Sequence, residues 1–184
     1  LSTGFEKLAR YGELIIGDMS DSKILDDIFS KYNIQAVFHF AAFSIVGEST
    51  QNPLKYYKNN VSGTINLLES MIKHNVNKII FSSTAAIFGN PEYTPIDESH
   101  PKNPINPYGK SKLMVENILQ DLSLSNGLSS ISLRYFNACG ADPDGELGEL
   151  HNPETHLIPL VLKTALNKRD EITIFGTDYE TKDG

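Results

Sequence analysis

The chain alternates short runs of consecutive apolar residues with longer segments in which apolar residues recur every three or four positions. The continuous runs predict buried strands, and the periodic segments predict amphipathic helices. Strands are expected at residues 13–18, 35–42, 77–83, 129–137 and 171–176. Helices are expected at residues 20–32, 53–74, 108–125 and 156–168, with long loops at 84–106 and 138–155.

Capping residues mark several of the helix ends. Ser20 or Asp21 can cap the first helix, because a short polar side chain there accepts a hydrogen bond from the helix N-terminus. Pro53 suits the first turn of the second helix, where its missing N–H costs nothing. Gly127 follows the third helix and can adopt the left-handed backbone that ends many helices.

The order of the elements predicts the fold class. Strands and helices alternate, and near-continuous apolar strands are typical of a parallel sheet with helices on both faces. We therefore expect an α/β fold with a doubly wound, Rossmann-like parallel sheet. Such sheets bind ligands beyond the carboxyl ends of their strands. The segments HFAAFS, FSSTAAIFG and RYFNACGA all fall at such ends.

Composition narrows the classes of ligand. The 184 residues carry a net charge of −7 and contain no block of Lys or Arg, which argues against nucleic acid or an anionic membrane as a partner. No apolar run approaches the ~20 residues that span a bilayer. The single cysteine, Cys139, cannot form an internal disulfide, and no Cys/His set has zinc-site spacing. We expect a cytoplasmic protein that binds a small molecule and no metal ion.

The segment NPYGKSKLMVENI places Tyr108 and Lys112 one helical turn apart, so both can face the same space. A tyrosine acts as a base only when ionised, and moving its pKa from ~10 to ~7 requires about 4 kcal/mol. A nearby cation supplies roughly 1 to 3 pKa units, so a second positive charge is needed, such as an oxidised nicotinamide ring. Thr84 can bind a reacting hydroxyl while Ser82 faces a cofactor. The alternative is that Tyr108 packs at a helix start and Lys112 is a solvated charge.

The chain carries, in this order, the motifs GD (17–18), HFAAFSIVGES (39–49), YYKNNVSGT (56–64), FSSTAAIFG (81–89), NPYGKSKLMVE (106–116), RYFNACGA (134–141), HLIP (156–159) and IFGTDYETKDG (174–184). Together these motifs resemble the UDP-glucose 4-epimerase family, a branch of the extended short-chain dehydrogenases/reductases. The resemblance covers the whole chain.

The resemblance implies a mechanism. Tyr108 as phenolate takes the proton from the hexose 4-hydroxyl, Lys112 lowers its pKa and binds the nicotinamide ribose, and Thr84 holds the same hydroxyl. NAD takes the C4 hydride, the 4-keto sugar turns within the site, and the hydride returns to the opposite face. The substrate implied is a UDP-hexose and the pathway galactose metabolism. A homodimer through helices 53–74 and 108–125 is implied by analogy.

The resemblance also implies site residues and domains. Residues 1–137 would form part of an NAD-binding domain, and residues 138–184 the start of a substrate-binding region. The implied NAD contacts are Asp18, Met19, Phe40, Ala41, Ala42, Ser44, Asn60, Ser82, Tyr108, Lys112 and Tyr135. The implied UDP-sugar contacts are Thr84, Asn137, His156, Leu157, Thr173 and Phe175.

Other interpretations of single residues stay open. Asp18 can simply cap the helix that follows it. His39, inside an apolar strand, is typical of a core residue, and His151 and His156 of solvated loop residues. Ser44 and His156 stand where some family members carry lysine and asparagine. No G-x-x-G-x-x-G or G-x-G-x-x-G occurs among the 13 glycines, so we expect the chain to match the middle of an epimerase, with the phosphate loop upstream.

Four other functions compete with the UDP-glucose 4-epimerase. A nucleotide-sugar 4,6-dehydratase would need an acid and a base directly after the threonine, where this chain has Ala85 and Ala86. An epimerase for N-acetylated UDP-hexosamines, or a 4-reductase, would share the fold and the Tyr/Lys pair. A non-catalytic nucleotide-sugar-binding protein is the alternative from another class.

Overall fold

The computed structural model describes residues 4–9 and 11–179 and divides the chain into two compact units. One unit spans Gly17–Asn137, and the other combines Leu1–Ile16 with Ala138–Gly184. The last residues of the IFGTDYETKDG motif, 180–184, lie outside the described residues. The assignment of an NAD-binding and a substrate-binding part to the chain stays a prediction.

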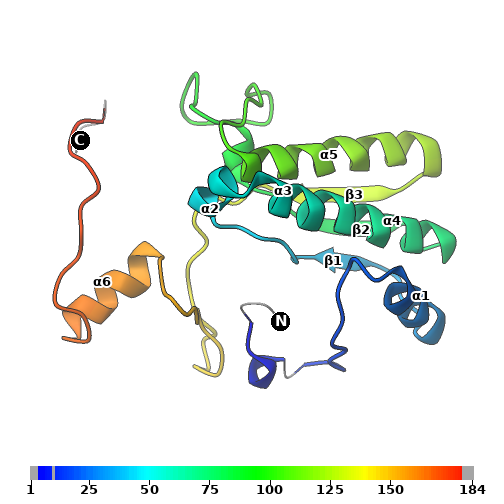
Figure 1. Cartoon of the computed structure of the whole chain (residues 1–184), viewed down its shortest axis with the longest axis horizontal. Coiled ribbons are helices and arrows are strands. Elements are labelled where there is room, and N and C mark those ends of the chain that lie inside the picture. The colour runs from blue at the N-terminus through cyan, green and yellow to red at the C-terminus, as the bar shows by residue number, and fades with distance from the viewer. Residues whose placement is uncertain (1–3, 10, 180–184) are drawn as a thin grey trace. The chain divides into compact units, whose positions relative to one another are not determined.

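A three-stranded parallel sheet forms the centre of the alternating α/β arrangement (Figure 1). The strands β1 (Val37–His39), β2 (Lys78–Ser82) and β3 (Ser129–Leu133) lie side by side in chain order. In the register, Phe81 pairs with His39 on one side and with Ser132 on the other. Because all three strands run parallel, their carboxyl ends meet at one edge of the sheet. The predicted fold class is confirmed.

Three helices pack against the sheet face that carries Ile79 and Phe81. Each contributes apolar side chains one turn apart, as an amphipathic helix does. The helices are α1 (Ser22–Lys31), α4 (Gly63–Lys73) and α5 (Pro107–Asn126). Their buried core residues, together with those of β2 and two loops, are Leu25, Phe29, Leu67, Leu68, Met71, Val76, Ile79, Phe81, Val115, Leu119 and Leu128.

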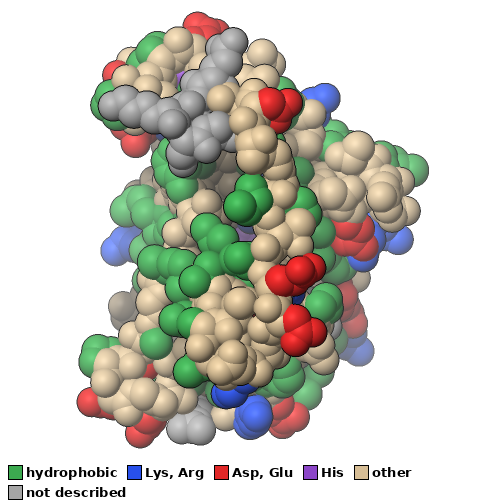
Figure 2. Space-filling model, turned by 90° about the vertical axis from the view of Figure 1, so that its left-hand side faces the viewer, with side chains coloured by type: hydrophobic (Ala, Val, Ile, Leu, Met, Phe, Trp, Pro, Cys, Tyr) green, Lys and Arg blue, Asp and Glu red, His purple; other side chains and the backbone are tan. Residues whose placement is uncertain are grey.

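The opposite face of the sheet is exposed in the described residues. Phe38 of β1 is 62% exposed and Ile131 of β3 is 58% exposed. The expectation that helices cover both faces therefore holds for one face only. Further large apolar side chains are exposed outside the sheet. Figure 2 shows apolar side chains in the middle of the molecular face that it draws.

Two predicted strands, at residues 13–18 and 171–176, are wrong. Both segments are irregular and mostly exposed, although their apolar runs match the strand pattern. A strand is stable only when its backbone groups pair with a neighbour. Neither segment pairs with a described strand, so the apolar pattern alone does not produce a strand.

The helical predictions hold, with local differences. The predicted helix 53–74 consists of α3 (Pro53–Tyr56), a π-helical turn η2 (Tyr57–Ser62) and α4 in succession. Asp21 caps α1 by accepting from two backbone N–H groups, and Gly127 ends α5 at φ 68°. The short helices η1 (Glu6–Leu8), α2 (Val46–Gln51) and η3 (Ala85–Ile87) were not predicted, and the last helix, α6, spans Leu157–Ala165.

The core of α5 gives a matched test of the packing. Leu119 is 1% exposed in the core, whereas Leu124 on the same helix is 85% exposed. We expect Leu119→Ala to lower the free energy of unfolding by about 2 to 5 kcal/mol through lost burial and a cavity. Leu124→Ala should change it by less than about 0.5 kcal/mol. Urea unfolding followed by circular dichroism measures both, and equal effects would contradict this placement of α5.

Candidate active site

The start of α5 positions the tyrosine of the predicted pair. Asn106 is the N-cap residue, and its side-chain oxygen accepts a hydrogen bond of 2.8 Å from the Gly109 N–H. Pro107 occupies the first turn, where its fixed φ suits a helix start. Asn106 and Pro107 thus start the helix at a fixed point, which places Tyr108 in its first turn and Lys112 one turn later.

Gly109 allows this first turn to touch the loop after β2. A Cβ at Gly109 would lie 2.6 Å from the carbonyl oxygen of Ala86 in η3. Only glycine permits so close a backbone approach. The contact brings Tyr108 beside Thr84, the N-cap residue of η3, and the two side chains share a hydrogen bond.

Lys112 is a buried cation that reaches the carboxyl end of β2. It is 3% exposed, and its Nζ donates a hydrogen bond of 2.6 Å to the carbonyl oxygen of Ser82. The same Nζ lies 4.8 Å from the ring centre of Phe81 and 6.0 Å from that of Tyr108. Burial lowers the pKa of Lys112 to about 8. The interpretation of Lys112 as a solvated surface charge is therefore wrong.

The phenol of Tyr108 needs more than this lysine to ionise at neutral pH. Burial raises the pKa of Tyr108 above its ordinary value, and the hydrogen bond from Thr84 opposes this only in part. An additional positive charge beside the ring would favour the phenolate. Such a charge is what an oxidised nicotinamide would bring to this position.

Asn60 is a predicted NAD contact, but its buried side chain is fully bonded within the protein. Its Oδ1 accepts from the Phe43 N–H, and its Nδ2 donates to the Phe43 carbonyl and to Ser111 Oγ. The amide therefore ties the loop after β1 to α5. It would reach a cofactor only by exchanging one of these bonds.

His39, interpreted from the sequence as a core residue, is 4% exposed and packs on Phe81. Its Nε2 lies 2.7 Å from Thr64 Oγ1, whose hydroxyl proton is donated to the Asn60 carbonyl. The hydroxyl has no second proton to give, so Nε2 carries the proton in this bond. Burial and the charge of Lys112 lower the pKa of His39 to about 4, which keeps it neutral.

Most of the other predicted NAD contacts lie along the carboxyl edge of the sheet. Phe40, Ala41 and Ser44 are exposed in the loop after β1, and Ala42 beside them is half-buried. The Tyr135 carbonyl accepts a hydrogen bond of 2.7 Å from the Ala85 N–H, which joins the loops after β2 and β3.

Asp18 and Met19 line a cavity of about 290 Å³ in the same unit. The other residues of its wall are Ser20, Phe43, Lys55, Lys58, Asn59 and Gly63. Asp18 does not cap α1, because Asp21 does; its side chain instead accepts from the Ser20 N–H at 2.7 Å. Of the two lysines at this wall, Lys55 is paired with Glu48, and Lys58 adds a further positive charge.

The predicted substrate contacts fall in both units. Thr84 and Asn137 belong to the unit 17–137. In the other unit, His156 is the N-cap residue of α6, and Leu157 begins that helix with 69% of its side chain exposed. Thr173 and Phe175 lie in an exposed irregular segment. Their common role in substrate binding stays a prediction.

The sequence analysis missed an ionic cluster behind the site. Glu116 accepts hydrogen bonds from Ser83 Oγ at 2.6 Å and from Arg134 Nε at 3.1 Å and Nη2 at 3.0 Å. Arg134 also pairs with Glu98, and Lys102 lies 3.4 Å from Glu116. Tyr108, Lys112 and Glu116 follow one another at intervals of four residues, which places all three on one helix face. This spacing was the signal in the sequence that could have indicated Glu116.

A parallel α/β sheet that carries the half-buried Tyr108 and the buried Lys112 and Thr84 at its carboxyl edge defines a Rossmann-like class of protein. A family model described as GDP-mannose 4,6 dehydratase matches residues 5–184, and the chain belongs to this family. No described helix is both long and apolar enough to cross a membrane.

Relatives named as epimerases are similar to the chain. A UDP-glucose 4-epimerase of Halalkalibacterium halodurans is 53% identical over 168 residues, which are 91% of this chain and 50% of the relative. The structure of UDP-glucose 4-epimerase from Brucella ovis in complex with NAD is 48% identical, with a TM-score of 0.94, over 100% of this chain and 56% of that one.

A third relative has a broader name. The UDP-Glc/GlcNAc 4-epimerase of Campylobacter jejuni is 44% identical with a TM-score of 0.75, over 97% of this chain and 55% of that one. The chain thus spans about half the length of the relatives that it matches. The resemblance to UDP-glucose 4-epimerases is confirmed.

The ionic cluster predicts unequal roles for two carboxylates that bind one arginine. Glu116 has a 6% exposed side chain, whereas that of Glu98 is 94% exposed. We expect Glu116→Gln to lower the free energy of unfolding by roughly 2 to 4 kcal/mol, because it leaves Arg134 without its buried partner. Glu98→Gln should cost less than about 1 kcal/mol.

The pH dependence checks the same assignment. Burial raises the pKa of Glu116, but hydrogen bonds from Arg134 and Ser83 lower it more, so it lies below its ordinary value of 4.5. The ionised Glu116 carboxylate therefore stabilises the folded state fully at pH values above its ordinary pKa. This contribution is lost as the pH falls through the lower pKa of the folded state. The gap between wild type and Glu116→Gln in urea unfolding should therefore shrink in acid; a gap that is constant with pH would contradict the ion pair.

The lowered pKa of Lys112 makes a second pH prediction. Below its folded pKa of about 8, both states carry the proton and the burial penalty is complete. Between about 8 and the ordinary 10.5, the folded state has lost the proton that the unfolded state keeps, so stability rises with pH. We expect wild type to gain stability relative to Lys112→Met over this interval in urea unfolding.

Lys110→Met is the matched control, since Lys110 is exposed on the same helix. It should follow wild type over the whole interval. Parallel curves for wild type and Lys112→Met would show that the Lys112 ammonium is solvated.

Proposed function

We propose that the protein interconverts UDP-glucose and UDP-galactose with NAD as cofactor, as part of galactose metabolism. The observation that carries the proposal is the group of Thr84, Tyr108 and Lys112 at the carboxyl end of β2. It occurs in a chain about half identical to proteins named UDP-glucose 4-epimerase. The proposed inversion at C4 requires one proton acceptor and a reversible redox step at the same carbon.

Tyr108 is the proposed proton acceptor for the sugar 4-hydroxyl. Thr84 shares a hydrogen bond with it and would orient the same hydroxyl. Bound NAD would supply the reversible two-electron oxidation and the positive charge that the phenol needs. Lys112, held by the Ser82 carbonyl, would bind the cofactor ribose and add a second cation. Each residue therefore has a part in moving one proton.

The described residues fit an elongated nucleotide cofactor in part. The cavity lined by Asp18 and Met19 offers space for a base, with Lys55 and Lys58 at its wall. The exposed loop after β1, Ser82 at the end of β2 and Tyr135 just after β3 all lie at the carboxyl ends of neighbouring parallel strands. The chain holds no glycine-rich phosphate loop, so direct measurement of NAD binding belongs to the test.

A second candidate is epimerisation of UDP-N-acetylhexosamines. The relative from Campylobacter jejuni is named for both glucose and N-acetylglucosamine substrates and is 44% identical. A UDP-sugar contact by Asn137, His156, Leu157, Thr173 and Phe175 is common to both proposals. Assays with both classes of UDP-sugar distinguish them.

A cytoplasmic homodimer is part of the proposal. Ile65 and Ile72 of α4 and Met114 of α5 are each more than a third exposed. Apolar side chains on two neighbouring helices suit an isologous interface. The cytoplasmic location rests on the single cysteine, Cys139, which is free.

Tyr108→Phe is the direct test of the catalytic proposal. It removes the hydroxyl that would accept the proton, and we expect UDP-galactose turnover to fall by about 10²- to 10⁴-fold. NAD binding, measured by calorimetry, should change little. Tyr93→Phe removes a hydroxyl bonded to Asp97 in an exposed loop and should leave turnover near wild type.

The outcomes separate the competing functions. Turnover by wild type that Tyr108→Phe does not reduce would overturn the assigned base. NAD binding without turnover on either class of UDP-sugar would favour the non-catalytic alternative.

A further inference from the structure

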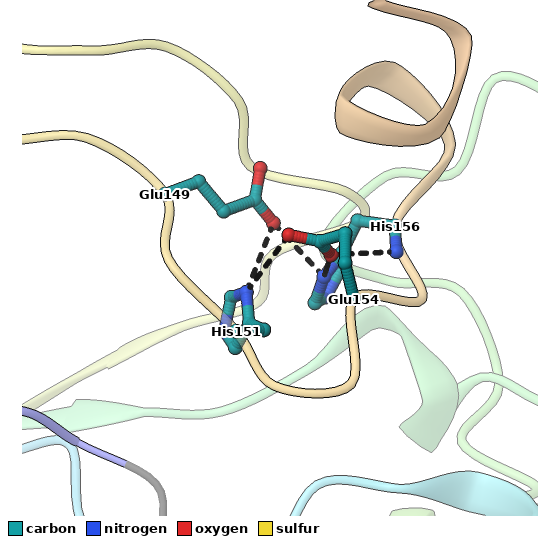
Figure 3. Close-up of side chains that lie close together, drawn as sticks. All are labelled: Glu149, His151, Glu154 and His156. Carbon is teal, nitrogen blue, oxygen red and sulfur yellow. Dashed lines mark hydrogen bonds and ion pairs between the residues drawn. The ribbon is translucent and has the colours of Figure 1, made fainter. Parts of the chain in front are cut away.

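Two histidines and two glutamates converge in the loop that precedes α6 (Figure 3). They are Glu149, His151, Glu154 and His156, all in the unit that contains residues 138–184. One nitrogen or oxygen from each residue lies within 4.8 Å of the corresponding atom of every other. The sequence analysis expected no metal site, because HNPETH lacks a familiar zinc spacing; the fold nevertheless brings four possible ligands together.

The cluster has more acceptors than donors. Glu149 Oε1 and Glu154 Oε1 each lie 2.9 Å from the same nitrogen, Nδ1 of His156. A ring nitrogen carries at most one hydrogen, so the two carboxylates must share it. Glu154 Oε1 also accepts from the backbone N–H groups of Thr155 and His156. Its other oxygen, Oε2, lies 3.6 Å from Nδ1 of His151.

Two carboxylates held this close repel each other, and a cation between them relieves the repulsion. The side chain of Glu154 is only 5% exposed and that of Glu149 is 22% exposed, so water screens them incompletely. The two imidazoles lie with ring centres 4.6 Å apart on the same cluster. Their nitrogens and the carboxylate oxygens thus face a common point.

We propose that Glu149, His151, Glu154 and His156 bind a divalent transition-metal ion of the zinc type. Zinc bonds of about 2.0–2.1 Å in a tetrahedron place neighbouring ligand atoms ~3.3 Å apart. The separations of 2.9 and 3.6 Å between the carboxylate oxygens and the imidazole nitrogens bracket that value. All four ligand atoms lie within 4.8 Å of one another, so metal binding requires side-chain movements that bring them closer within one eight-residue segment.

The donor set selects the class of ion. Two imidazole nitrogens with two carboxylate oxygens suit zinc, nickel or cobalt, whereas magnesium and calcium prefer shells of oxygen alone. The cluster belongs to one unit, and Tyr108 and Lys112 belong to the other. It shares His156 with the proposed substrate contacts, so metal binding is measured without nucleotide or substrate.

The test is a zinc titration of the purified protein, carried out in a Cys139→Ser background. The exposed thiol of Cys139 would otherwise bind zinc by itself. Competition with a chromophoric chelator gives the affinity. Glu149→Gln and His151→Gln should each weaken zinc binding at least about tenfold, since each removes a ligand. Asp144→Asn, which removes an exposed charge from the same loop, should change it less than about twofold.

Zinc X-ray absorption on the parent protein provides a readout that does not depend on how the variants fold. It should show four nitrogen or oxygen ligands at about 2.0–2.1 Å, with the scattering of two imidazoles. Magnesium should not displace the zinc. Absence of saturable zinc binding, affinities equal in all three variants, or a shell without imidazole would each overturn the proposal and leave a hydrogen-bonded His/Glu cluster.

Discussion

The close approach of Gly109 to the Ala86 carbonyl fixes how far α5 lies from the end of β2, and the site depends on that distance. A side chain at this position would place a carbon 2.6 Å from the oxygen and push the helix away. With the helix this close, one face of α5 engages three consecutive residues of the strand end. Tyr108 bonds to Thr84, Lys112 to the Ser82 carbonyl and Glu116 to Ser83 Oγ.

This arrangement buries two opposite charges, the Lys112 ammonium and the Glu116 carboxylate, beside the short segment at the end of β2. Burial costs each of them free energy, but only Glu116 has charged partners, Arg134 and Lys102, that offset the cost. Among the residues that the structure describes, Lys112 has a carbonyl acceptor and no carboxylate partner. Burial lowers its pKa to about 8, so most of it stays protonated at neutral pH. The site thus holds an uncompensated cation beside a phenol that is itself neutral. An incoming group with a further positive charge can then shift the phenol towards its anion.

The sequence predicted what depends on neighbouring residues and missed what depends on distant ones. The helix predicted from Tyr108, its stop at Gly127 and the spacing of Tyr108 and Lys112 are local, and α5 confirms them with a start one residue earlier, at Pro107. Residues 13–18 and 171–176 have the apolar pattern of strands but no described partner strand, which local reasoning cannot foresee. Glu116 meets Arg134 across 18 positions, and the motif that contains Glu116 gave no sign of that partner. Similarly, the spacing of His151 and His156 gave no sign that two glutamates converge on them.

The distribution of proton carriers favours an oxidation and re-reduction at one carbon over an elimination. Loss of water from a sugar requires a base at one carbon and an acid at the neighbouring oxygen, in addition to the redox pair. Ala85 and Ala86 follow Thr84 without any titratable group. The carboxylate bound to this strand end is Glu116, and its two oxygens already accept from Ser83 and Arg134 while its lowered pKa keeps it from holding a proton. That leaves Tyr108, with Thr84 to orient it, and Lys112 as the titratable groups on this face of α5, and the proposed function assigns the proton exchange with the ligand to Tyr108. A single such group is sufficient for the inversion of a carbinol centre, and this agrees with the names of the relatives rather than with the dehydratase after which the family model is described.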